Sequence, residues 1–206
     1  MFVGMIWRPT PGRHESFMQA NEFWSLFGPV RYFDSMHEPF NRAASRNKAV
    51  RAAESAGVNK LVITDADCIP EPHALEEAFE AADDTAVHLP YTSCITHDQN
   101  GNPVGEFGFT CGGVYVATIN AWNAVGGMDE RFNLWGPEDF AFMLAHRTLL
   151  GKEIVRHPGK MLSLGHERDP HRHADDEDDE LVQLYRRYET ADGDQAAMEA
   201  LCFPWS

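Results

Sequence analysis

The sequence has few cysteines, no long hydrophobic run and a shortage of basic residues, and each shortage excludes a class of protein. Its four cysteines stand far apart with no CxxC pair, which argues against a disulfide framework or a structural zinc site. The apolar start, Met1 to Trp7, is too short to span a bilayer and no signal-like cleavage site follows it. We therefore expect free thiols in a cytoplasmic protein, although a catalytic domain separated from a membrane anchor would have the same composition.

The shortage of basic residues is the strongest of these biases. Only 17 Lys and Arg stand against 32 Asp and Glu, giving a formal net charge of -15. Such a surface argues against general nucleic-acid binding, but it does not exclude a nucleotide held through a metal. Six of the acidic residues form one run at 175–180, which is interpreted as a solvated surface segment.

The length and the position of this acidic run suggest how the chain is divided. A chain of 206 residues can bury one substantial core. We expect one domain over residues 1–167. An acidic, partly helical extension over residues 168–206 is expected to pack on that domain or to trail from it.

The first half alternates apolar runs with amphipathic segments, a pattern typical of an α/β protein. Strands are predicted at residues 2–7, 30–33, 61–64 and 85–89, and helices at 15–26, 41–56 and 72–79. The second half predicts a hairpin around 98–102, strands at 114–117, 153–156 and 161–164, and helices at 120–125, 137–150 and 181–188. The order implies a Rossmann-like three-layer α/β/α sandwich with a mostly parallel sheet, whose ligands gather at the carboxyl ends of the strands.

Two carboxylates separated by one residue end the third predicted strand, as Asp65-Ala66-Asp67. Residues two apart on an extended chain point the same way, so Asp65 and Asp67 can converge on one divalent cation and, through it, on a diphosphate. Asp is also common where strands end, and the pair could simply cap the turn that leads to Pro70. The pattern alone leaves both interpretations open.

A second acidic pair lies in the run Trp135-Gly136-Pro137-Glu138-Asp139. If Pro137 is the first helical residue, Glu138 and Asp139 lie in the first turn, where the helix dipole favours ionised carboxylates. They could serve as a base or merely stabilise the helix. Trp135 could present its indole to a sugar ring or belong to the core.

In this order, the DxD pair, Gly112-Gly113, the run GGMDERF at 126–132 and the run WGPED at 135–139 resemble glycosyltransferases of the GT-A fold. The later half resembles the galactosyltransferase-like region shared by β-1,4-galactosyltransferases and polypeptide N-acetylgalactosaminyltransferases. Arg46-Asn47 resembles the Arg-Asn of the helix before the DxD strand in family 2-type enzymes. The sequence departs from the pattern at Pro137, where Gly is usual, and at Met128, where Phe is frequent.

The resemblance implies a Mn2+ or Mg2+ site and a donor site on the DxD side. Asp67 would be the firmest metal ligand, Asp65 would reach the ion or the donor ribose directly or through water, and His166 would complete the site. His171 and His173 are rivals for that last position. The other residues implied on the donor side are Arg46, Asn47, Ala66, Gly112, Gly113 and Trp135.

The same resemblance implies the acceptor side and the reaction. Asp139 would be the catalytic base, and Glu138 would bind acceptor or sugar hydroxyls. A hexosyltransferase would then move a sugar from a nucleotide diphosphate sugar, UDP-sugar favoured over GDP-sugar, to an acceptor hydroxyl with inversion. Retention remains open, and the sequence does not identify the acceptor.

Polar residues at the ends of the first two strands add weaker candidates for nucleotide binding. Asp34 could hydrogen-bond the base or ribose, and Arg8 or Arg13 could contact base or phosphate, although strand-end polar residues are often structural. Two other classes stay open: a metal-dependent phosphatase or nucleotidyltransferase, and a module that binds a nucleotide sugar or glycan without turnover.

Overall fold

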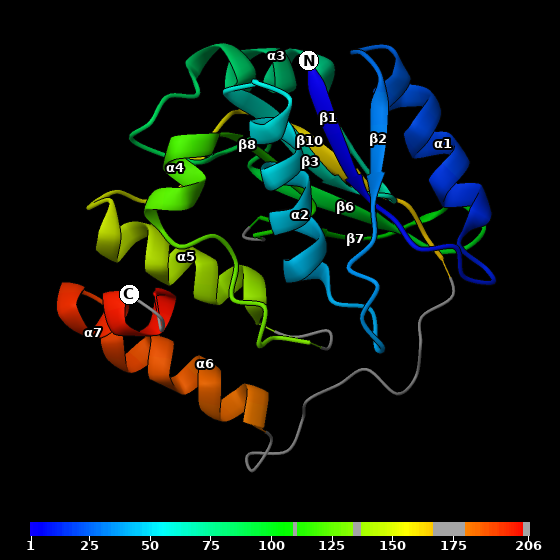
Figure 1. Ribbon diagram of the computed structural model, residues 1–206. Helices are drawn as coiled ribbons and strands as arrows, with labels where there is room; N and C mark the ends of the chain where they lie inside the picture. Colours follow the sequence, from blue (N-terminus) through cyan, green and yellow to red (C-terminus); the bar gives the residue numbers. More distant parts are fainter. Residues whose placement is uncertain (109–110, 134–136, 167–179, 204–206) are drawn as a thin grey trace.

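A six-stranded sheet forms the centre of the molecule in this computed structural model, which describes residues 1–108, 111–133, 137–166 and 180–203. The strands lie in the order β2, β1, β3, β8, β5, β9; Figure 1 labels the first four of them. Their bounds are Phe2–Ile6 (β1), Val30–Phe33 (β2), Lys60–Asp65 (β3), His88–Leu89 (β5), Val114–Thr118 (β8) and Val155–Arg156 (β9). Only β8 runs against its neighbours, so the predicted mostly parallel α/β sheet is confirmed.

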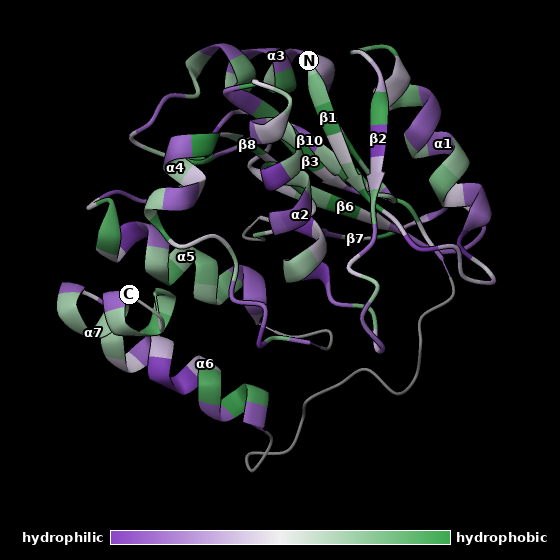
Figure 2. Cartoon of the chain, viewed as in Figure 1, coloured by the Kyte–Doolittle hydropathy of each residue, from purple (hydrophilic) through white to green (hydrophobic). Residues whose placement is uncertain are grey.

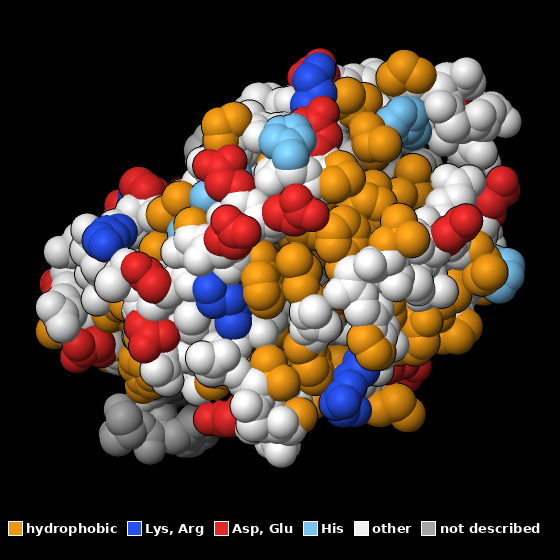
Figure 3. Space-filling model, turned by 90° about the horizontal axis from the view of Figure 1, so that it is seen from above, with side chains coloured by type: hydrophobic (Ala, Val, Ile, Leu, Met, Phe, Trp, Pro, Cys, Tyr) orange, Lys and Arg blue, Asp and Glu red, His pale blue; other side chains and the backbone are white. Residues whose placement is uncertain are grey.

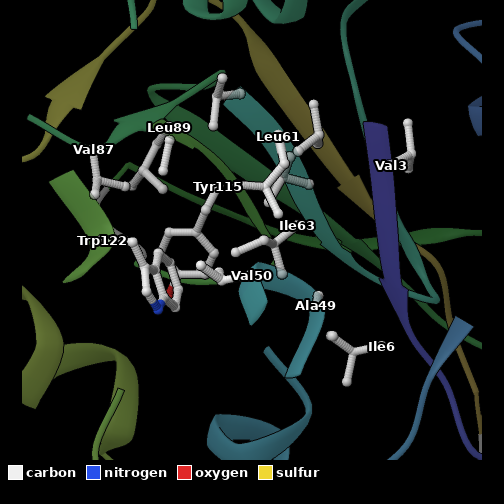
Figure 4. Packing of buried hydrophobic residues seen from close by; sticks show 14 of the residues in the cluster. Val3, Ile6, Ala49, Val50, Leu61, Ile63, Val87, Leu89, Tyr115 and Trp122 are labelled. Carbon is white, nitrogen blue, oxygen red and sulfur yellow. The ribbon is translucent and has the colours of Figure 1, made fainter. Parts of the chain in front are cut away.

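Buried apolar side chains cover both faces of the central strands. Val62 and Ile63 point to opposite faces of β3, and neither is exposed. Parallel strands covered on both sides require such residues. Figure 2 shows the hydrophobic strands against helices of mixed character, and Figure 4 shows Ile63 near Tyr115 and Trp122 in the core.

Helices α2 (Arg42–Ser55) and α3 (Pro72–Ala81) cover opposite faces of the sheet. Asp65 reaches Arg46 on α2, whereas Lys60 Nζ donates to the carbonyl oxygen of Phe79 on α3 at 2.8 Å. Because side chains alternate along a strand, residues 60 and 65 of β3 lie on opposite faces. Helix α1 (His14–Ser25) contacts β2, and α4 (Ile119–Ala124) packs beside α2.

A second sheet of four strands extends the first from the DxD segment. Its order is β4, β10, β6, β7, with bounds Cys68–Pro70 (β4), Ser93–His97 (β6), Pro103–Phe107 (β7) and Lys160–Ser163 (β10). Strands β6 and β7 form the predicted hairpin, closed by Asp98 Oδ1, which accepts from the backbone N–H groups of Asn100 and Asn102. Strand β4 begins directly after Asp67, so the aspartate pair lies at the junction of the two sheets.

Three helices at the end of the chain pack on one another: α5 (Glu138–Leu149), α6 (Glu180–Ala191) and α7 (Gln195–Cys202). They share a buried cluster that includes Leu144 of α5, Tyr188 of α6 and Met198 of α7. Thus α6 and α7 pack on the domain. The predicted domain boundary at 167 and most of the acidic run lie outside the described residues.

Several predicted elements differ in length or in detail. Strand β5 is only two residues long because Asp83 Oδ1 accepts from the backbone N–H and the hydroxyl of Thr85, which holds that segment in a turn. Strand β9 also has two residues, and β4 and α7 were not predicted. Pro137 is the N-cap of α5 rather than its first helical residue, with a ψ of 26°, while Glu138 and Asp139 do occupy the first turn.

The surface agrees with the acidic composition. On the face seen in Figure 3, hydrophobic side chains gather in the middle, acidic side chains border them, and basic side chains do not form a continuous patch. No helix in the described parts of the chain has the length and apolar character needed to cross a membrane.

His88 on β5 and His157, the residue after β9, form a buried pair through which we expect the stability of the fold to depend on pH. His88 is 4% exposed, and its Nδ1 lies 2.8 Å from Nε2 of His157, whose other ring nitrogen lies 3.4 Å from Glu77 Oε1. Burial, followed by the charge of His157, lowers the pKa of His88 to about 4. Lys60 and His146 lower this pKa further, and Asp83 opposes them.

We predict that acid destabilises the fold through His88. Above about pH 6.5 both the folded and the unfolded His88 are neutral; between about pH 6.5 and 4 only the unfolded form gains a proton, so stability falls. The loss from this group is about 2–3 kcal/mol. Urea unfolding at pH 7, 6 and 5 should show a steeper loss for the wild type than for His88→Gln, and parallel curves would contradict the prediction.

Candidate functional site

The side chain of Arg46 lies at the centre of the candidate site and joins two of the predicted carboxylates. Its Nη2 donates to both oxygens of Asp65 at 2.9 Å, and its Nη1 donates to Asp139 Oδ1 at 2.7 Å. The side chain of Arg46 is 1% exposed. The end of β3 and the start of α5, far apart in the sequence, therefore meet at one buried cation.

Close packing of α2 on the sheet places Arg46 at this point. Asn41 caps the helix by accepting from the backbone N–H of Ala44 at 2.8 Å. Ala49 then faces Gly4 of β1, where an added Cβ would come within 2.9 Å of Ala49 Cβ. A larger residue at position 4 or 49 would push α2 and its guanidinium away from the strand ends.

Glu138 adds a third carboxylate to this cluster and Arg42 a second cation. Glu138 Oε1 lies 2.5 Å from Arg42 Nη2 and 3.6 Å from Arg46 Nη1, and the carboxylate is 1% exposed. Burial raises the pKa of Glu138 to about 7, although Arg42 opposes the shift. Three carboxylates thus share two guanidinium groups. Contact of Glu138 with acceptor or sugar hydroxyls stays a prediction, since its carboxylate here faces the arginines.

Asp67 and His166 converge on the other side of Asp65. His166 Nε2 lies 2.9 Å from Asp67 Oδ2. The backbone N–H of Leu164, after β10, donates to the carbonyl oxygen of Asp67 at 2.8 Å, which fixes the histidine segment against the DxD segment. Burial acts to raise the pKa of Asp67, but hydrogen bonding to His166 and the charge of Arg13 leave it below its usual value, so the carboxylate is ionised.

Asp67 and His166 fit a divalent cation better than Asp65 does. A carboxylate oxygen beside an imidazole nitrogen is a donor pair that suits Mn2+. Both oxygens of Asp65 are taken by Arg46, which agrees better with an indirect role. Arg13 also lies against His166, with Nη2 2.6 Å from Nε2, and it would have to move for metal binding. No group of three or more such ligands occurs within the described ranges, and His171 and His173 lie outside them.

The glycine pair lies between the two acidic groups. Gly112 has φ +112°, and an added Cβ would clash with Asp139 Oδ2; at Gly113 it would lie 2.9 Å from Cys68 Sγ. The carbonyl oxygen of Gly113 accepts from the backbone N–H of Asp65 at 2.7 Å. Backbone without side chains therefore lies between the DxD segment and Asp139. The close approach of a donor sugar to this backbone stays a prediction.

The remaining donor candidates have protein partners. Arg8 donates to both oxygens of Asp34 at 2.8 and 2.6 Å and lies 5.0 Å from the ring centroid of Phe40. Asn47 donates to the carbonyl oxygen of Met128 and accepts from Trp122 Nε1, so it holds the GGMDERF loop. Direct donor contacts of these residues and of Ala66, which is 9% exposed, stay predictions. Trp135 lies outside the described residues.

Sequence reasoning missed Tyr115 and Arg42. The Tyr115 hydroxyl donates to Asp139 Oδ1, and Arg46 lies 5.4 Å from the centroid of its ring. The antiparallel register of β3 and β8 places Tyr115 opposite Ile63, which the sequence does not indicate. Arg42 was detectable because it stands four residues before Arg46, on the same face of a predicted helix.

This architecture is the GT-A fold of glycosyltransferases. The catalytic domain of Drosophila beta1,4-galactosyltransferase 7, solved with xylobiose, superposes with a TM-score of 0.61 at 17% identity, over 91% of this chain and 79% of that one. A mutant of that enzyme, solved with manganese, UDP-Gal and xylobiose, gives a TM-score of 0.53 at 18% identity, over 76% and 65%.

GalNAc-T7, solved with UDP, GalNAc and Mn2+, gives a TM-score of 0.58 at 13% identity, over 92% of this chain and 42% of that one. At such identities the similarity establishes the fold alone. No protein-family model matches the chain, and no curated protein matches it.

We predict that Gly112→Ala costs more stability than Gly57→Ala. Both positions have a positive φ, but an added Cβ at Gly57 has no atom within 4 Å, whereas at Gly112 it would displace Asp139 from Arg46. Gly57→Ala should lose about 1 kcal/mol through backbone strain. Gly112→Ala should lose roughly 1–3 kcal/mol more because a buried ion pair is disturbed. Equal losses in urea unfolding would show that Gly112 is not confined by Asp139.

Proposed function

We propose that the chain is a metal-dependent hexosyltransferase that moves a sugar from a nucleotide diphosphate sugar, with UDP-sugar favoured, to an acceptor hydroxyl. The observation that carries the proposal is the arrangement of Asp67 with His166 on one side of the Gly112-Gly113 backbone and Asp139 on the other. The side of Asp67 and His166 suits a cation and a diphosphate. On the other side, Asp139 offers its carboxylate to the hydroxyl of an acceptor. The neighbours of the fold, whose structures contain UDP, UDP-Gal or manganese, support the same chemistry.

Each side chain has a role in the proposed reaction. Asp67 and His166 would hold Mn2+ or Mg2+, with Asp65 reaching the ion through water or the donor ribose. When bound, the cation offsets negative charge on the leaving diphosphate. Arg13, once displaced from Asp67 and His166, would lie within reach of the phosphates.

Asp139 would act as the general base. It takes the proton of the acceptor hydroxyl while that oxygen bonds to the anomeric carbon. The bond from this carbon to the diphosphate oxygen breaks, and the nucleoside diphosphate leaves with the electron pair. Displacement of this kind inverts the anomeric configuration. The acceptor itself stays unidentified, and the acidic surface does not suit general nucleic-acid binding.

The same proposal includes a reducing, cytoplasmic location. All four cysteines are free thiols, and Cys68 and Cys94 are buried. Free cysteines are typical of reducing compartments.

The deciding experiment incubates the purified chain with Mn2+ and a panel of UDP- and GDP-sugars and measures release of the nucleoside diphosphate. We expect slow donor hydrolysis that EDTA and Asp67→Ala abolish. Asp139→Asn should lower the rate by about 10²–10⁴-fold, while binding of the donor, measured by calorimetry, survives.

Asp192→Asn is the matched control, because Asp192, directly after α6, also accepts from an arginine, Arg147 near the C-terminal end of α5. Its turnover should equal that of the wild type. Donor binding without turnover would favour a non-catalytic module. Phosphate release from simple phosphoesters would favour a phosphatase.

A further inference from the structure

The two oxygens of Asp139 have different surroundings. Oδ1 accepts from Arg46 Nη1 at 2.7 Å and from the Tyr115 hydroxyl. Within the described residues, Oδ2 accepts no hydrogen bond and faces the backbone of Gly112. The carboxylate is therefore held through one oxygen, and the other is directed at the bare backbone where a donor sugar would approach.

The packing of Tyr115 fixes the position of its hydroxyl group. Its side chain is completely buried in β8, and its ring makes edge contacts with Trp122 and Phe142 at centroid distances of 5.9 Å. Burial, and then the charge of Asp139, raise the pKa of Tyr115 well above its ordinary value. This shift favours the protonated phenol, which is the form that donates the hydrogen bond to Asp139.

We propose that Tyr115 is a positioning residue that, together with Arg46, fixes Oδ1 of Asp139 and leaves Oδ2 as the oxygen that receives the acceptor proton. The proposal rests on the proposed transferase function and adds the atom at which the proton is held. Arg46 makes the same contact but also neutralises Asp65, so its removal would leave buried carboxylates without a cation. Tyr115 carries no charge, and its hydroxyl can be removed alone.

The test compares Tyr115→Phe with the wild type in donor hydrolysis, or in transfer once an acceptor is known. We expect kcat to fall about 10-fold, since a hydrogen bond to a charged group is lost. KM for the nucleotide sugar and Kd for UDP with Mn2+ should change less than about 2-fold, because Tyr115 is not expected to touch the donor. The kcat of each variant is calculated per UDP-binding site. Unfolded protein in a preparation therefore does not lower the measured kcat.

Tyr188→Phe is the matched control. Tyr188 is also buried and donates to an aspartate, Asp129 Oδ2, at 2.9 Å, but it belongs to the cluster of α5, α6 and α7. Both tyrosine variants should lose thermal stability, but the control should keep its kcat.

The outcomes separate the two proposals. If Asp139→Asn lowers turnover as expected while Tyr115→Phe keeps the wild-type kcat, the positioning role is overturned and the transferase stands. Equal losses of kcat in both tyrosine variants would show a general loss of rigidity and also overturn it. A wild type without turnover, or an Asp139→Asn variant with the wild-type rate, would overturn the proposed function itself.

Discussion

A buried guanidinium, that of Arg46, is the interaction on which the rest of the site depends. Burying a charge is costly unless opposite charges and hydrogen bonds compensate for the lost hydration. Arg46 is compensated by Asp65 on one nitrogen and Asp139 on another. Lysine could not replace it, because a single ammonium group lacks the planar fork that reaches two carboxylates in different directions. The site is therefore an electrostatic unit, and its carboxylates hold their places because a shared cation lies between them.

This unit joins parts of the chain that have separate tasks. Asp65 belongs to the strand that leads to Asp67 and to the proposed cation site, and Asp139 belongs to α5, on the proposed acceptor side. Asn47, next to Arg46, bonds the loop before that helix through Met128. One turn of α2 thus sets the distance between the DxD segment and α5, and the small residues Gly4 and Ala49 set how closely α2 lies on β1.

The sequence predicted the parts of this design that depend on local pattern. Alternating strands and helices, the aspartate pair at the end of β3 and the acidic first turn of α5 all follow from periodicity and from the residues that end elements. The convergence of Asp67 and His166 was predicted only from resemblance, because about a hundred residues separate them. Tyr115 was not predicted, because its role depends on the insertion of antiparallel β8 beside β3. The pairing of Arg46 with Asp65 and Asp139 likewise depends on tertiary packing that no local pattern encodes.

The position of α6 and α7 has a consequence for the order in which the protein is completed during synthesis. Helix α5 buries Leu144 and Ala145 against these two helices, and Arg131 of the preceding loop donates to the carbonyl oxygen of Leu201 in α7 at 2.9 Å. A growing chain can form the strands and helices around Asp65 and Asp67 early. The helix that carries Asp139 gains its outer cover only when α7 leaves the ribosome. The segments that carry Asp65, Asp67 and His166 have thus all left the ribosome before the helix that carries Asp139 is fully covered.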